Sequence, residues 1–219
     1  MAISNENRAV FVFEAEDAPL VGALRRFRKR LFVDELGWDL TVEGEEERDQ
    51  FDTDQALHCA LLECDQIVGG FRLTPTTVPY LSRDVFPHLA SSRPFPARPD
   101  FAEVSRLGVI GEGSVRIERA LKVYGLMIHI ASYQRLTGLV AIADLTYERF
   151  LRRIGITTRR YGPPQAIGTD RFGRTLHAVA GEIPLADQPP RTLARLRSTL
   201  QTVEIHDAPC LFGPQRLSA

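Results

Sequence analysis

Apolar residues recur in the first part of the chain at spacings that separate a strand from a helix. Ala9–Phe13 is a short apolar run that predicts a strand, and a polar segment follows it. A helix is predicted from about Pro19, because apolar side chains then recur every three or four residues and basic ones fill the other faces. The apolar positions are Val21, Leu24, Phe27, Leu31 and Phe32. The prediction is an amphipathic helix with a basic flank.

The next segments alternate between loop-like and strand-like patterns. Glu43–Asp54 is acidic and has no apolar period, which predicts a loop or a short irregular helix. Two apolar runs, Leu57–Glu63 and Ile67–Thr74, lie three residues apart and predict a β-hairpin. Pro79–Asp100 holds five of the fourteen prolines, so we expect an extended connection with at most one short helical turn.

The second half of the chain alternates strand and helix patterns. Predicted strands are Glu103–Ile110, Leu139–Ala143, Thr158–Tyr161 and Leu176–Ile183. Predicted helices are a long one through Ile117 and Ala131, Tyr147–Ile154 ended by Gly155, and a last one from the Pro189-Pro190 pair through Leu200. The strand-helix-strand-helix order from Glu103 to Ile154 implies parallel pairing of the first two of these strands. The fold class is therefore α/β.

Composition excludes several classes of function. The net charge of -1 gives no reason to expect binding to nucleic acid or to a membrane, and no apolar run is long enough for a signal peptide or a membrane helix. The three cysteines, Cys59, Cys64 and Cys210, form no CxxC pair, and the five histidines are scattered. We expect a cytoplasmic protein with no disulfide framework, no metal site and no covalent nucleophile motif.

Eight residues stand in a fixed order across the first half of the chain. They lie in RKRLFVDELGW, ERDQFD, VGGFRLTPT and EVSRLGV, and they are Arg28, Phe32, Trp38, Asp49, Asp52, Arg72, Glu103 and Arg106. From about Arg25 to Val109 this pattern resembles the signature of the acyl-homoserine-lactone synthases, the LuxI-type autoinducer synthases. The resemblance implies one domain over residues 1–219 with a GNAT-like acyltransferase fold. That fold has a mixed central sheet with a strand splay, flanked by helices.

The resemblance also implies a binding site for S-adenosylmethionine, used as a substrate and not as a cofactor. Its residues would be Arg28, Phe32, Trp38, Asp49, Asp52 and Arg72. On composition alone the acidic segment would be a solvated loop, and the arginine and aromatic residues would be core packing with a snorkelling cation. A purely structural ion pair is an equal alternative for Arg72.

Glu103 and Arg106 are the predicted catalytic residues. Strand alternation places Glu103 and Ser105 on one face and Arg106 on the other. The resemblance implies that Glu103 takes a proton from the donor amine, directly or through water, and that Arg106 organises the acidic pair. Without the resemblance, Glu103 would be an edge charge.

The implied reaction has two steps. The amine of S-adenosylmethionine attacks an acyl thioester, and backbone N–H groups near Arg106 and Leu107 stabilise the oxyanion. The methionyl carboxylate then attacks its own γ-carbon, which closes the homoserine lactone and expels methylthioadenosine. The acyl donor is acyl carrier protein or acyl-CoA. The basic pairs Arg152-Arg153 and Arg159-Arg160 suit an acidic carrier but could equally be solvated faces.

The acyl pocket is expected in the segment from Leu126 through Ala180. Family members that favour 3-oxo chains carry a threonine where this chain has Ala143 or Asp144, so we expect an unsubstituted, branched or aryl acyl group. Two alternatives remain. A GNAT-type N-acetyltransferase would need a pyrophosphate-binding turn, and Gly111-Glu112-Gly113 lacks that pattern. A non-catalytic relative that binds an acyl carrier or ligand would not need all eight positions filled.

Overall fold

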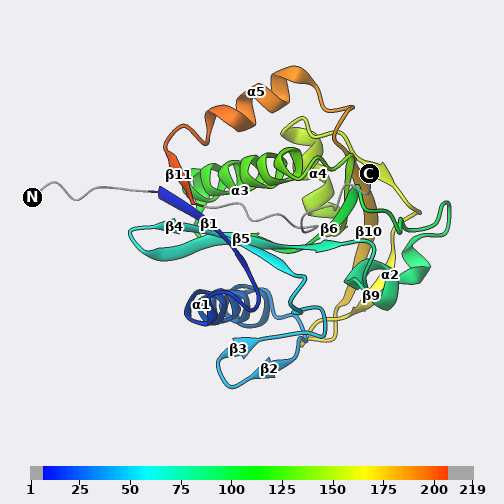
Figure 1. Cartoon of the computed structure of the whole chain (residues 1–219). Coiled ribbons are helices and arrows are strands. Elements are labelled where there is room, and N and C mark those ends of the chain that lie inside the picture. The colour runs from blue at the N-terminus through cyan, green and yellow to red at the C-terminus, as the bar shows by residue number, and fades with distance from the viewer. Residues whose placement is uncertain (1–6, 207–219) are drawn as a thin grey trace, which may run out of the picture.

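The computed structural model describes residues 7–206, which form a mixed α/β fold around one large sheet (Figure 1). In this range the sheet has nine strands in the order β11-β1-β4-β5-β6-β7-β10-β8, and β9 pairs with β10. The strands of the sheet are β1 (Asn7–Phe13), β4 (Leu57–Glu63), β5 (Gln66–Pro75), β6 (Phe101–Val109), β7 (Gly138–Asp144), β8 (Arg159–Arg160), β9 (Gln165–Thr169), β10 (Thr175–Pro184) and β11 (Val203–His206). A separate two-stranded sheet pairs β2 (Val42–Glu43) with β3 (Glu46–Glu47).

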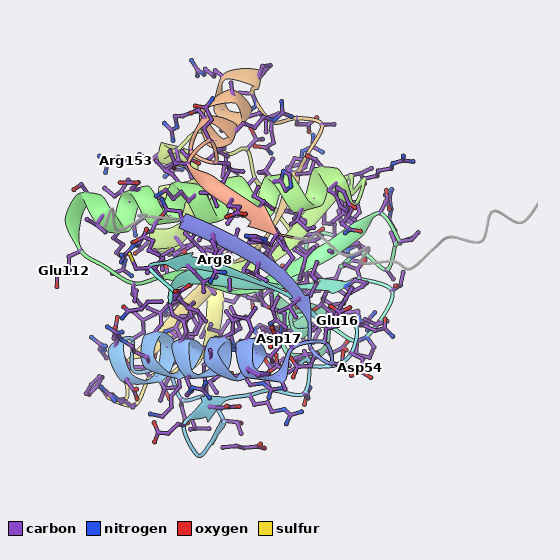
Figure 2. The ribbon with its side chains drawn as sticks, turned by 60° about the vertical axis from the view of Figure 1, so that its left-hand side comes forward. Arg8, Glu16, Asp17, Asp54, Glu112 and Arg153 are labelled. Atoms are coloured by element: carbon purple, nitrogen blue, oxygen red, sulfur yellow. The ribbon has the colours of Figure 1, made fainter. Side chains whose placement is uncertain are left out.

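Helices cover both faces of the large sheet. They are α1 (Ala18–Arg28), the π-helix η1 (Lys29–Glu35), α2 (Leu81–Val85), the 3₁₀ turn η2 (Pro87–Leu89), α3 (Gly113–Tyr133), α4 (Leu145–Arg153) and α5 (Pro190–Ser198). Figure 1 shows α1 and the β2–β3 hairpin below the sheet, and α3, α4 and α5 above it. Figure 2 shows Arg153 on the α3 side of the sheet and Asp54 on the α1 side. Among the described residues, no helix is both long and apolar enough to cross a membrane.

Two consecutive glycines let helices approach β5 closely from both sides. A Cβ on Gly69 would come within 2.8 Å of Val123 in α3. A Cβ on Gly70 would come within 3.3 Å of Leu24 in α1, and within 2.4 Å of the carbonyl oxygen of Cys59. Separations this short are not tolerated between real atoms, so both positions require glycine.

The predicted parallel pair and the predicted splay are both present. Strands β6 and β7 pair in parallel at their first three residues, where Phe101 lies opposite Gly138 and Glu103 lies opposite Val140. Both strands continue beyond that point without pairing to each other. The two strands therefore separate after Glu103. The GNAT-like fold class is confirmed in its main features: a mixed sheet, an opening between two neighbouring strands, and helices on both faces.

Several predictions for the connecting segments were incomplete. The acidic segment 43–54 contains part of the β2–β3 hairpin, and the proline-rich connection contains both α2 and η2. Strands β9 and β11 were not predicted, and β8 is limited to two residues. Short edge strands of this kind are stabilised by pairing with distant segments, which leaves little periodicity in the sequence. Cys210 lies outside the described residues.

Candidate functional site

Six charged side chains on the α1 side of the sheet form a closed ring in which every arginine contacts two carboxylates. In order around the ring they are Arg28, Asp52, Arg72, Asp49, Arg106 and Glu47. The nitrogen–oxygen distances that close the ring are 2.5–2.8 Å. Three positive and three negative charges cancel. Buried charges are costly unless they are paired and hydrogen-bonded, and here each has two partners of opposite sign.

Four separate elements supply the ring. Arg28 is the last residue of α1 and donates two hydrogen bonds of 2.8 Å to the two carboxylate oxygens of Asp52. Arg72 lies in β5, donates to both aspartates, and also donates from Nε to the Ser105 hydroxyl at 3.0 Å. The backbone N–H of Asp49 donates to Asp52 at 3.0 Å, which fixes the loop that carries the two aspartates. The ring therefore joins α1, the acidic segment, β5 and β6.

The arginines of the ring hold both of its aspartates in the ionised form. Burial alone would raise the pKa of Asp52, but the bonds and charges of Arg28 and Arg72 outweigh it and hold that pKa far below its usual range. The pKa of Asp49 is likewise lowered, because Arg72 and Arg106 outweigh the effect of burial. The side chain of Asp49 is 15% exposed, against 0% for Asp52. Asp49 is therefore the aspartate that a bound molecule could reach.

Arg106 reaches the ring because β6 carries a bulge. Gly70 pairs with Gly108 and Arg72 pairs with Ser105, so β6 has one residue more than β5 between these pairs. Arg106 has φ of 53°, in the left-handed region. The prediction that Arg106 faces away from Ser105 was wrong, since simple alternation does not hold through a bulge. The bulge turns Arg106 toward Glu47 and Asp49.

An aromatic pair lies at the end of the N-terminal helix. The rings of Phe32 and Trp38 stack with centroids 5.1 Å apart and planes 21° apart. The helix becomes π-helical at Lys29, and the Trp38 N–H donates to the Phe32 carbonyl at 2.9 Å. A π-helical turn often marks a functional site. Together with Leu31 and Phe27, this pair forms a small apolar cluster adjoining the charged ring.

Glu103 lies apart from the ring, at the point where β6 and β7 separate. It is the last residue of β6 that pairs with β7, and it is fully buried. Its carboxylate accepts hydrogen bonds from the N–H of Leu81 at 3.0 Å, and from the N–H and hydroxyl of Ser82. Burial raises the pKa of Glu103, although the bonds from Ser82 act in the opposite direction. Glu103 is thus a basic carboxylate that also holds the first turn of α2.

Sequence reasoning did not identify Glu47, and it did not identify the group of Glu14, Arg25 and His58 that lies beside Asp52. Glu47 is 0% exposed and joins Arg28 to Arg106. His58 contacts Glu14 at 2.7 Å, and Glu14 is also paired with Arg25. A signal was present for Glu47: three arginines were predicted close to only two aspartates, so a third carboxylate was needed for charge balance.

Two other features of the described residues have some character of a binding site. Glu14, Asp52 and His58 bring ligand atoms within 4.8 Å of one another, but both carboxylates are already bound to arginines. The absence of a metal site therefore stays a prediction. A cavity of about 350 Å³ lies near the start of β6, and it contains none of the predicted site residues. Its lining residues are Arg93, Pro94, Phe95, Pro96, Arg98, Phe101, Arg159, Tyr161 and Glu182.

Comparison with known proteins identifies close relatives. The sequence model of the family described as "Autoinducer synthase" matches residues 14–183. An acyl-homoserine-lactone synthase from Pseudomonas aeruginosa is 32% identical over 170 residues, which cover 76% of this chain and 81% of that protein.

Two solved structures show how the fold compares. The structure of BjaI, a CoA-dependent acyl-homoserine lactone synthase with SAM and isopentyl-CoA, matches with a TM-score of 0.77 and 24% identity, and the match covers 94% of this chain and 96% of that one. A putative N-acetyltransferase from Lactobacillus plantarum matches with a TM-score of 0.53 and 20% identity, and the match covers 83% of this chain and 99% of that one. At these identities the two matches support the fold alone.

Proposed function

Since this chain belongs to the autoinducer synthase family and is an acyl-homoserine-lactone synthase, an acyltransferase, we propose how its own residues divide the reaction. The amino donor is S-adenosylmethionine, which the structural neighbour BjaI holds. The observation that carries the proposal is the position of Glu103. Its carboxylate lies where β6 and β7 open, on the sheet face that also carries the charged ring.

We assign the recognition of the donor to the ring and to the aromatic pair. S-adenosylmethionine carries a sulfonium, an amine and a carboxylate, so its net charge is positive when the amine is protonated. Asp49 is the partly exposed carboxylate of the ring and would attract these cations. Arg72 donates hydrogen bonds to Asp49 directly. Asp52, which is held by Arg28, accepts a hydrogen bond from the Asp49 N–H and so fixes its position. Phe32 and Trp38 provide the apolar cap for the donor.

Glu103 has the role of the base in the first step. The donor amine must lose a proton to attack, and that proton passes to the Glu103 carboxylate, directly or through water. The amine nitrogen bonds to the thioester carbon, and the carbon–sulfur bond breaks to release the carrier thiol. The raised pKa of Glu103 suits this residue to the role, because a base is most effective when its pKa is near the working pH.

The bulge in β6 supports the predicted oxyanion site. A bulge leaves its extra residue outside the ladder of backbone hydrogen bonds, so that an N–H group becomes available to a ligand. The extra residue falls at Arg106 or Leu107, next to the opening of the strands. An N–H donor placed there would stabilise the negative charge that develops on the thioester oxygen.

The second step is intramolecular. The carboxylate of the acylated donor attacks its own γ-carbon, the carbon–sulfonium bond breaks, and the electron pair leaves with methylthioadenosine. No further base is required, because a carboxylate is already ionised at neutral pH. The contribution of the protein is to hold the chain of the donor in a folded conformation, which the cap and the ring would do.

The acyl group and its carrier are proposed from the end of β7 and from the basic pairs. Asp144 accepts a hydrogen bond from the N–H of Tyr147 at 2.7 Å and so caps α4, which favours Ala143 as the position that would face the acyl group. Alanine offers no hydroxyl to a 3-oxo group, and this favours an unsubstituted, branched or aryl chain. All four arginines of the two basic pairs are exposed, and Arg159 and Arg160 also pair with Asp187 and Glu148. An acyl carrier protein or acyl-CoA would be the donor.

Mass spectrometry of the reaction products tests the proposed function. Purified protein would be incubated with S-adenosylmethionine and a panel of acyl-CoA and acyl carrier protein thioesters. We expect acyl-homoserine lactone and methylthioadenosine in equal amounts with at least one donor. Acylation of an added amine without lactone formation would instead indicate an N-acetyltransferase.

A further inference from the structure

The hairpin between β9 and β10 ends in a tip whose shape is fixed by its own bonds. Asp170 is 5% exposed and accepts hydrogen bonds from the N–H groups of Phe172 and Arg174, both at 2.9 Å. The Gly173 N–H donates to the Asp170 carbonyl at 2.9 Å, and Gly173 has φ of +76°. The bonds that shape the tip therefore lie within the tip itself.

This tip lies against the end of the N-terminal helix, more than 130 positions away in sequence. The Arg171 N–H donates to the Gly37 carbonyl at 3.0 Å, and the Arg171 guanidinium donates to the Asp34 carbonyl at 3.2 Å. A Cβ on Gly37 would come within 3.1 Å of the Phe172 ring. In Figure 1 the hairpin, drawn in yellow, extends to the same side of the sheet as α1.

The contact fixes the residue that precedes Trp38. Carbonyl groups at the C-terminal end of a helix lack partners within the helix, and a cation that donates hydrogen bonds to them is favourable there. The Arg171 guanidinium donates to one such carbonyl, at Asp34, and the Arg171 backbone N–H donates to the carbonyl of Gly37 just beyond the helix. The chain turns at Gly37, with φ of +72°, directly into Trp38. Trp38 then stacks on Phe32.

We propose that Arg171, at the tip of the β9–β10 hairpin, is a positioning residue that holds the Phe32–Trp38 cap over the donor site. The inference rests on the proposed function for the role of the cap. It also connects two parts of the chain: the hairpin belongs to the half expected to line the acyl pocket, and the cap belongs to the half expected to bind S-adenosylmethionine. Arg171 touches neither reactant in this proposal. Its guanidinium acts through the Asp34 carbonyl and its side chain lies against Gly37, and Arg171→Ala removes both of these contacts but keeps the backbone N–H that donates to Gly37.

Trp38 is the single tryptophan of the chain, so its fluorescence reports on the cap directly. We would compare Arg171→Ala with Arg174→Ala in the absence of any ligand, using the emission maximum and quenching by acrylamide. Arg174 lies on the same tip, and its guanidinium bonds within the tip to Asp170 at 2.6 Å. We expect Arg171→Ala to shift the emission to the red and to raise the quenching constant, and Arg174→Ala to match the unsubstituted protein.

Kinetics would show whether the cap acts on donor binding. We expect a rise of roughly five- to tenfold in KM for S-adenosylmethionine, since only part of the effect of losing one charged hydrogen bond is passed on to the donor site. We expect that rise for Arg171→Ala with kcat and the KM of the acyl donor nearly unchanged, and partial recovery in Arg171→Lys. A general loss of folding would move all of these parameters together.

Two results would overturn the proposal. The first is a Trp38 signal in Arg171→Ala that is identical to that of Arg174→Ala. The second is a rise in KM for S-adenosylmethionine without any change in Trp38 quenching, which would show that Arg171 acts by another route. If the unsubstituted protein made no lactone, the proposed function would fail, but the fluorescence comparison would still decide whether Arg171 positions Trp38.

Discussion

Glu47→Gln tests whether the charged ring is a cooperative unit. The substitution keeps the size and one acceptor oxygen of the side chain but removes its charge, so the ring changes from neutral to a net charge of +1. Arg28 would keep Asp52 as a partner, and Arg106 would keep Asp49. Both arginines would lose a charged partner within a buried site.

The expected cost follows from these contacts. A hydrogen bond to a charged group contributes about 1.5–3 kcal/mol. Two such bonds are weakened and one acceptor remains, so we expect a loss of about 3 kcal/mol in the free energy of unfolding, near the lower end of the range for breaking a buried ion pair. For a chain of this length, that loss corresponds to a fall in Tm of about 6–12 °C. The KM for S-adenosylmethionine should also rise, because the site becomes more positive.

Thermal unfolding followed by circular dichroism measures the effect. The matched control is Glu45→Gln, since Glu45 lies two residues away and its side chain is 80% exposed beside Lys29. The control should leave Tm unchanged. A fall in Tm of less than about 2 °C in Glu47→Gln, or an equal fall in both variants, would refute the argument that Glu47 closes the ring, given the size of the expected effect.

Three further predictions concern the donor, the acid stability and the acyl group. Asp49→Asn should raise the dissociation constant for S-adenosylmethionine about tenfold or more, as measured by calorimetry, because it removes the reachable charge; unchanged affinity would count against this assignment. Burial lowers the pKa of His58 to about 3 from an ordinary 6.5, so the unfolded chain binds a proton that the folded chain does not, and stability falls as the pH drops from about 6.5 toward 3. Urea titrations at several pH values give the free energy of unfolding, and its slope against pH between pH 6.5 and 4.5 should decrease by up to about 1.4 kcal/mol per pH unit in His58→Asn. An unchanged slope would contradict this assignment of His58. Ala143→Thr should raise kcat/KM for 3-oxo relative to unsubstituted acyl donors, and an unaltered ratio would remove Ala143 from the acyl pocket.

The sequence was sufficient to predict the main elements of the fold but not its local irregularities. The helix from Pro19, the hairpin of β4 and β5, and the parallel pair β6–β7 follow from periodicity, because each element buries a continuous face. The bulge at Arg106 could not be predicted in this way. A bulge depends on how two strands pair, and the sequence of one strand does not reveal its register.

The candidate site shows the same limit. Motif spacing pointed to the three arginines and two aspartates, which the structure places in one ring. Glu47 was missed because an acidic segment in sequence offers several equivalent carboxylates, and only the fold distinguishes the buried Glu47 from the exposed Glu45. The contact of Arg171 with Gly37 joins segments far apart in the chain, and no local pattern indicates it.

The rate of amide formation in a single turnover tests the central claim most directly. Glu103→Gln should slow this step by about 10²–10⁴-fold, because the base is removed, while the affinity for S-adenosylmethionine changes little. Ser82→Ala is the matched control, since it removes one hydrogen bond to Glu103 but keeps the carboxylate. The control should retain most of the rate. An unchanged rate in Glu103→Gln, or an equal loss in both variants, would contradict the role of Glu103 as the base.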